Sequence, residues 1–151
     1  MPYQKDHLVT PFLEQEWIET DEDVDIVSFG QSKDPQLKKM ALFDAVVNNT
    51  DRKYGHLLVE DGNLFGCDHG VTFHVENKLR TVIWQFAGEE LGAQEKKLLQ
   101  KSYELDYGKI FDSLLTNAEI DALYARIELL IEEGRFPVPS DSWPAIPWPP
   151  V

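Results

Sequence analysis

A helix between Thr116 and Gly134 is the strongest prediction from the hydrophobic pattern of the chain. Thr116 and Glu119 have the spacing of a capping box, in which two side chains and two backbone amides bind each other at a helix start. Gly134 readily adopts the left-handed backbone conformation that ends a helix. Apolar residues recur between these ends at the spacing of one helical face. They are Ile120, Leu123, Tyr124, Ile127, Leu130 and Ile131.

The pattern predicts another helix over residues 35–48. Asp34 and Pro35 are favourable residues for the N-cap and the first helical position. An apolar stripe follows at helical spacing, and Asp44 lies on it. A carboxylate is costly to bury unless it is paired, so we expect Asp44 to anchor the loop after the helix through hydrogen bonds. The stripe consists of Leu37, Met40, Ala41 and Val47.

A β-hairpin is predicted next. Two strand-like runs, 56–60 and 63–67, flank an Asp-Gly dipeptide at 61–62, which is a strong signal for a two-residue turn. With that turn, His56 is expected to lie opposite Cys67. The residue after Cys67 then lies diagonally beside His56.

The other segments have weaker patterns. Residues 11–19 are expected to be a short strand or an extended segment, and the acidic residues of 19–25 a solvated loop. Residues 71–86 are expected to be extended or irregular. Helices are predicted over about 93–104 and 107–115.

The C-terminal tail begins near Phe136 and holds six of the nine prolines, together with Trp143 and Trp148. So many prolines exclude a regular helix or a central strand. We expect the tail and both of its tryptophans to pack back on the body of the protein. Docking on a polyproline-binding partner is the weaker alternative.

These elements predict a single domain over residues 1–151 with an α+β fold, mainly helical and with a small β-hairpin. It would comprise a strand and acidic loop at 1–33, a core at 34–134 and a packed tail at 135–151. A chain of this length with 42% hydrophobic residues can bury a sizeable core.

The net charge of −13 and the low isoelectric point, near 4.6, change the range of expected partners. Such a surface repels phosphate backbones and anionic lipids, so nucleic-acid binding is not expected. No apolar run approaches the roughly 20 residues of a membrane span. Cys67 is the only cysteine, which excludes an intrachain disulfide, and no signal-like stretch is present at the start. A cytoplasmic location is therefore expected.

Two short polar stretches carry the candidate chemistry: 49–52, Asn-Thr-Asp-Arg, and 67–70, Cys-Asp-His-Gly. Phosphoryl transfer to a hydroxyl requires one carboxylate to orient or accept the hydroxyl proton and another to hold Mg²⁺ against the nucleotide phosphates. The predicted hairpin would bring the loop of Asp51, His56 and Asp68 to one end of the sheet.

Ordinary structural roles compete with this interpretation. Asp51 could cap a turn and Asp68 could close the hairpin, as aspartates commonly do. For His56, a metal ligand and an ordinary histidine at a strand end are evenly balanced. His69 and His74 are better explained as structural or hydrogen-bonding residues, because no pair of possible ligands has a recognised zinc spacing.

The residues from Phe43 to Arg52 and from Gly66 to Gly70 resemble the catalytic core of the phosphatidylinositol 3-/4-kinase-like superfamily. More narrowly, the chain is similar to a group of bacterial proteins identified as members of that superfamily. This similarity includes residues 68–81 and the ending at 135–150, and it extends over nearly the whole chain from about Trp17. The resemblance implies a kinase-like C-terminal lobe whose hairpin carries the metal-site motif.

The resemblance assigns roles to individual residues. Asp51 matches the catalytic aspartate that orients or accepts the hydroxyl proton, and Arg52 matches the arginine that follows it and shapes the loop. Asp68 matches the main Mg²⁺ ligand. His56 stands where the superfamily usually has an asparagine as second metal ligand. An imidazole suits Zn²⁺ or Mn²⁺ better than the oxygen-preferring Mg²⁺.

The implied cofactor is ATP with Mg²⁺ or Mn²⁺, and Trp17 and Asn49 are the expected nucleotide-contacting residues. Kinase folds bind the nucleotide between two lobes, with a lysine on an N-lobe strand. This sequence resembles the C-terminal lobe only, so an upstream segment, a partner chain or a second copy would complete the cleft. Two functions follow: a phosphotransferase acting on an alcohol group, or a catalytically inactive kinase-like binding or regulatory module.

Overall fold

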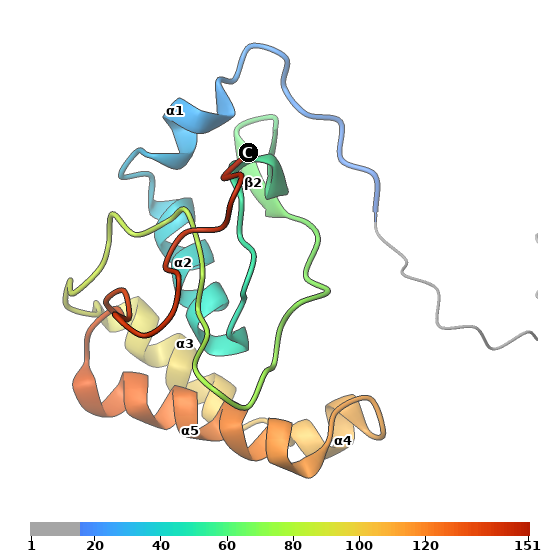
Figure 1. The fold of residues 1–151 in the computed structure, drawn as a ribbon, viewed down its shortest axis with the longest axis vertical. Coiled ribbons are helices and arrows are strands. Elements are labelled where there is room, and N and C mark those ends of the chain that lie inside the picture. Colours follow the sequence, from blue (N-terminus) through green and yellow to red (C-terminus); the bar gives the residue numbers. More distant parts are fainter. Residues whose placement is uncertain (1–15) are drawn as a thin grey trace, which may run out of the picture.

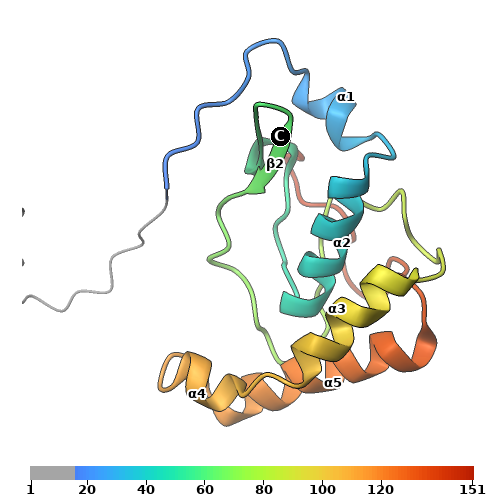
Figure 2. The same cartoon turned by 180° about the vertical axis from the view of Figure 1, so that it is seen from behind.

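Three helices form the core of the protein in the computed structural model, which describes residues 16–151 (Figure 1). They are α2 (Pro35–Val47), α3 (Ala93–Tyr103) and α5 (Asn117–Glu133). Both α2 and α3 pack against α5, and the view from behind shows α3 lying along α5 (Figure 2). Leu37, Leu99, Leu123 and Ile127 are almost completely buried where these helices meet.

The ends of α2 and α5 have the predicted capping residues. The Asp34 side chain accepts a hydrogen bond from the backbone N–H of Gln36 at 2.8 Å. Thr116 and Glu119 form the reciprocal capping box, and the C-cap Gly134 has a φ of 63°. Both helices are therefore confirmed. Asn48, which was predicted as the last residue of α2, is instead its left-handed C-cap.

The predicted hairpin is also present. Strand β1 (Leu57–Glu60) pairs with β2 (Asn63–Gly66) in an antiparallel two-stranded sheet, and the register matches Leu57 with Gly66. The backbone N–H of Cys67 donates to the carbonyl of His56 at 3.0 Å, which extends the same register by one pair.

Short helices complete the regular structure of the described part of the chain. They are α1 (Ile26–Gly30), the 3-10 turn η1 (Tyr54–His56) and α4 (Tyr107–Phe111). The prediction over 107–115 was too long, because Asp112 has a φ of 45° and ends α4. Helix α1 was not predicted, because the acidic residues before it indicated only a solvated loop. The predicted strand at 11–19 falls partly outside the described residues, and residues 16–19 belong to no strand.

The long connection between the hairpin and α3 is irregular, as predicted, and backbone hydrogen bonds hold its middle against the polar loop. The N–H of Arg80 donates to the carbonyl of Asn49, and the N–H of Arg52 donates to the carbonyl of Arg80. The N–H of Val82 then donates to the carbonyl of Arg52. These three bonds fix the loop that carries Asp51.

The C-terminal tail returns across the molecule to the hairpin (Figure 1). The carbonyl of Ala145 accepts from the Thr81 backbone N–H and from the Trp84 indole, and the carbonyl of Pro150 accepts from the N–H of Tyr54. The expectation of a packed tail is confirmed for the backbone. Of the two tail tryptophans, Trp148 was predicted wrongly, because 87% of its surface is exposed.

Over residues 16–151 the fold is thus α+β and mainly helical, with one small antiparallel sheet. Within residues 16–151, no helix combines the length and apolar character that crossing a membrane requires.

Candidate functional site

A completely buried ion pair supports the polar loop. The Asp44 carboxylate accepts from Nε of Arg52 at 2.9 Å and from its terminal nitrogen at 2.8 Å, and neither side chain is exposed. The Asn49 amide donates to the same carboxylate at 3.0 Å. Buried charges require such pairing. The expectation that Asp44 anchors the loop is therefore confirmed.

The remaining donors of Arg52 connect this pair to the hairpin. One terminal nitrogen donates to the carbonyls of His56 and Cys67, each at 3.2 Å. The other lies 2.7 Å from Nε2 of His69. Arg52 therefore links the loop to both ends of the hairpin. Because it is buried, it supports the loop and the hairpin from inside.

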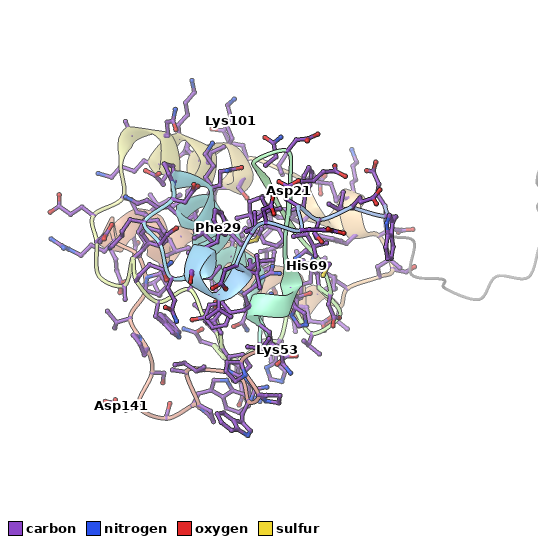
Figure 3. The ribbon with its side chains drawn as sticks, turned by 90° about the horizontal axis from the view of Figure 1, so that it is seen from above. Asp21, Phe29, Lys53, His69, Lys101 and Asp141 are labelled. Carbon is purple, nitrogen blue, oxygen red and sulfur yellow. The ribbon has the colours of Figure 1, made fainter. Side chains whose placement is uncertain are left out.

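His69 is held in one neutral form by this contact. A guanidinium can only donate, so Nε2 of His69 is the acceptor and its proton resides on Nδ1. Burial lowers the pKa of His69 below its usual value, and the charge of Arg52 lowers it further. His69 is half-buried and is labelled in the view from above (Figure 3). Its structural role agrees with the preference reached from the sequence.

Asp51 is fixed through its backbone while its side chain stays accessible. Its N–H donates to the side-chain oxygen of Asn49 at 3.0 Å. One carboxylate oxygen lies 3.6 Å from a terminal nitrogen of Arg80, and about 30% of the Asp51 side chain is exposed. A carboxylate in this setting can accept a proton from a bound hydroxyl.

Arg80 is a site residue that the sequence did not indicate. Its Nε donates to the carbonyl of Thr50 at 2.8 Å, and its guanidinium lies over the Trp143 ring, 5.9 Å from the ring centre. Arg80 thus holds both the backbone and the carboxylate of the loop. Arg80 is far from Asp51 along the chain, so no local sequence pattern could have predicted their contact.

His56 joins the loop of Asp51 to Asp68. Its Nδ1 lies 2.9 Å from the Asp51 carbonyl, and its Nε2 lies 3.4 Å from a carboxylate oxygen of Asp68. The backbone N–H of Lys53 also points to Nδ1, at the longer distance of 3.4 Å. The shorter contact indicates that Nδ1 carries a proton and donates it to the Asp51 carbonyl. The hairpin therefore brings the three residues to one end of the sheet, as its register predicted.

The pair of His56 and Asp68 could hold a metal ion. The Asp68 side chain is 65% exposed, and the His56 side chain is 15% exposed. Among residues 16–151, no group of three histidine, cysteine, aspartate or glutamate side chains is arranged to hold a metal. Any ion here would take its remaining ligands from water or a substrate.

The two residues expected to contact a nucleotide, Trp17 and Asn49, do not lie beside His56 and Asp68 in an accessible position. Asn49 is completely buried, and its side chain is occupied by Asp44 and the backbone of Asp51. Trp17 lies in the extended segment before α1, with 88% of its surface exposed. The structure thus groups His56 and Asp68 with the Asp51 loop, while Asn49 supports that loop from inside.

The chain is similar to Protein Rv2133c of Mycobacterium tuberculosis (strain ATCC 25618 / H37Rv), with 40% identity over 129 residues. The match covers 83% of this chain and 46% of that protein, so the chain spans about half the length of this relative. No family model and no solved structure matches the chain. Because the name of the relative states no activity, the function has to be inferred from the site.

Proposed function

We propose that this protein transfers a phosphoryl group from ATP to an alcohol, in the manner of the phosphatidylinositol 3-/4-kinase-like superfamily. The position of His56 between the Asp51 loop and Asp68 carries this proposal. It unites the candidate base and the candidate metal ligand in one place. A cytoplasmic location fits ATP as the donor.

Asp51 would act as the base. Its carboxylate is partly exposed, and the loop behind it is fixed by Asn49, Arg80 and the buried pair of Asp44 and Arg52. A rigid base costs little reorganisation when a hydroxyl binds, and positioning is the main contribution to phosphoryl transfer.

Asp68 and His56 fit a divalent metal such as Mg²⁺ or Mn²⁺. With a proton on Nδ1 bound to the Asp51 carbonyl, Nε2 of His56 has its lone pair directed toward Asp68. Such a bond on the far nitrogen commonly orients metal-binding histidines. One carboxylate and one imidazole leave positions for water and phosphate oxygens. When bound, the ion would neutralise phosphate charge, which an acidic protein cannot do by itself.

A non-catalytic binding or regulatory module is the second candidate. The burial of Asn49 favours it, because this residue cannot contact a nucleotide while it holds Asp44 and Asp51. Under this alternative, the ion pair and hairpin preserve a scaffold whose chemistry has been lost. Under the first proposal, a further segment, a partner chain or a second copy would supply the rest of the nucleotide cleft.

Thermal unfolding with and without ATP and Mn²⁺ tests the proposal. A ligand at 100 times its dissociation constant stabilises the folded state by about 2.7 kcal/mol, and we expect a clear rise in the unfolding temperature at millimolar nucleotide. Asp68→Asn should abolish that rise. Asp121→Asn, an exposed change on α5, should preserve it. No rise in the unchanged protein would favour the binding module.

A further inference from the structure

We propose that a cleft beside α2 binds a small aromatic molecule bearing a carbonyl group. The cleft has a volume of about 320 Å³, within the range of small-molecule sites. Phe43, which is 44% exposed, lies at its wall. This inference does not depend on the phosphotransfer proposal.

The apolar walls come from separate parts of the fold. Val46 lies on α2, Phe73 follows the hairpin, Phe111 lies on α4 and Leu123 on α5. The rings of Phe73 and Phe111 meet edge to face, with their centres 5.2 Å apart. Aromatic rings favour such offset and edge-on contacts. A planar aromatic ligand would therefore match these walls better than a flexible polar one.

His69 lines the cleft and carries its proton on one defined nitrogen. Its Nε2 accepts from Arg52, so its Nδ1 carries the proton. With Nε2 occupied by Arg52, Nδ1 is the ring nitrogen through which His69 can donate to a further group. Since His69 lines the cleft, a ligand with an acceptor oxygen could satisfy the donor.

Ser102 and Tyr107 contribute a second donor. Their hydroxyl groups bind each other, and either oxygen can be the donor. One bond uses one of the two hydroxyl protons, which leaves the other without an acceptor in the described structure. Both residues line the cleft. The polar part of the site therefore offers a hydroxyl proton beside hydroxyl oxygens, and the oxygen of Thr72, whose proton goes to the His69 carbonyl, can only accept.

The absence of charged walls refines the ligand class. None of the described residues that line this cleft is an aspartate, glutamate, lysine or arginine. A cationic amine would be desolvated there without a counter-charge, which is costly. A carbonyl oxygen can accept from the available donors, and a neutral aromatic body can fill the rest. An aromatic amide or ketone meets both conditions.

Ligand-observed NMR with naphthamide tests the proposal, and naphthylmethylamine is the matched cationic control. We expect naphthamide to bind the full chain with a dissociation constant of about 1 mM or tighter, and the amine to bind at least about tenfold more weakly. Val46→Phe should fill the cleft and weaken naphthamide at least about tenfold. Ile110→Phe adds a similar ring at an exposed position on α4 and should change nothing.

Removal of the hydroxyl groups tests the donor independently of cleft filling. Ser102→Ala and Tyr107→Phe should each leave one free hydroxyl proton and therefore bind naphthamide like the unchanged protein. The double variant should lose roughly 3- to 10-fold in affinity. Equal binding of amide and amine would overturn the proposal. So would equal effects of Val46→Phe and Ile110→Phe, or a double variant that binds as well as either single variant.

Discussion

Asp44 and Arg52 form an ion pair in which both side chains are completely shielded from solvent. The pair stands between α2 and the loop that carries Asp51, and Arg52 extends it to the hairpin carbonyls and to His69. The geometry of the candidate site thus depends on one buried cation. Removing one member of such a pair leaves the other charge uncompensated.

We therefore expect Arg52→Met to lower the free energy of unfolding by about 3–5 kcal/mol, measured by urea denaturation. Arg135→Met is the matched control, because Arg135 pairs with Glu90 at the exposed surface. It should change stability by less than about 0.5 kcal/mol. The double variant Asp44→Leu/Arg52→Met should regain part of the loss, since no lone charge remains. Equal losses at positions 52 and 135 would contradict this account.

His69 should make the stability depend on pH above the range of the carboxylates. Its pKa is lowered in the folded protein, so the unfolded chain binds a proton more readily. The stabilisation is complete above the usual histidine pKa, near 6.5, and is lost as the pH falls below it. We expect the urea concentration at the unfolding midpoint to decrease as the pH is lowered from 7.5 to 5.5.

The matched variants for this pH effect are His69→Gln and His74→Gln. The first should flatten the slope of stability against pH in that interval, although it lowers stability overall by freeing an Arg52 donor. The second should keep the slope. A slope unchanged by His69→Gln would show that another group is responsible.

The capping box of α5 gives a prediction for helix stability. Thr116→Ala removes the side-chain oxygen that accepts from the Glu119 N–H. It should cost about 1 kcal/mol, visible as a lower thermal midpoint. Ser113→Ala, an exposed change just before the helix, should leave the midpoint unchanged. Similar shifts for both variants would argue against a capping contribution.

Local patterns predicted the parts of the fold whose causes are local. The capping box of Thr116 and Glu119 and the turn at 61–62 each set their own geometry. Even the pairing of His56 with Cys67 followed from the turn. Asp44 was predicted to be paired because its position on an apolar stripe required it, but its partner could not be named from spacing.

The rest depends on contacts between distant segments. Arg80 reaches Asp51 because backbone hydrogen bonds place 80–82 beside the loop, and the sequence gives no sign of that pairing. Burial of Asn49 likewise follows from the position of Asp44 in three dimensions. Trp148 was expected to pack, yet proline content constrains the tail backbone without determining which side chains it buries.

Phosphate release from ATP in the presence of Mn²⁺ is the most direct test of the proposed phosphoryl transfer, with water as the simplest hydroxyl acceptor. The full chain should release phosphate above the protein-free background. Asp51→Asn should reduce that rate at least about 100-fold, because loss of a general base typically costs this much, while Asp121→Asn should leave it unchanged. An equal rate in the protein and its Asp51→Asn variant would contradict the assignment of Asp51 as the base. No release above background would contradict a kinase site that works in this chain without a further segment or partner.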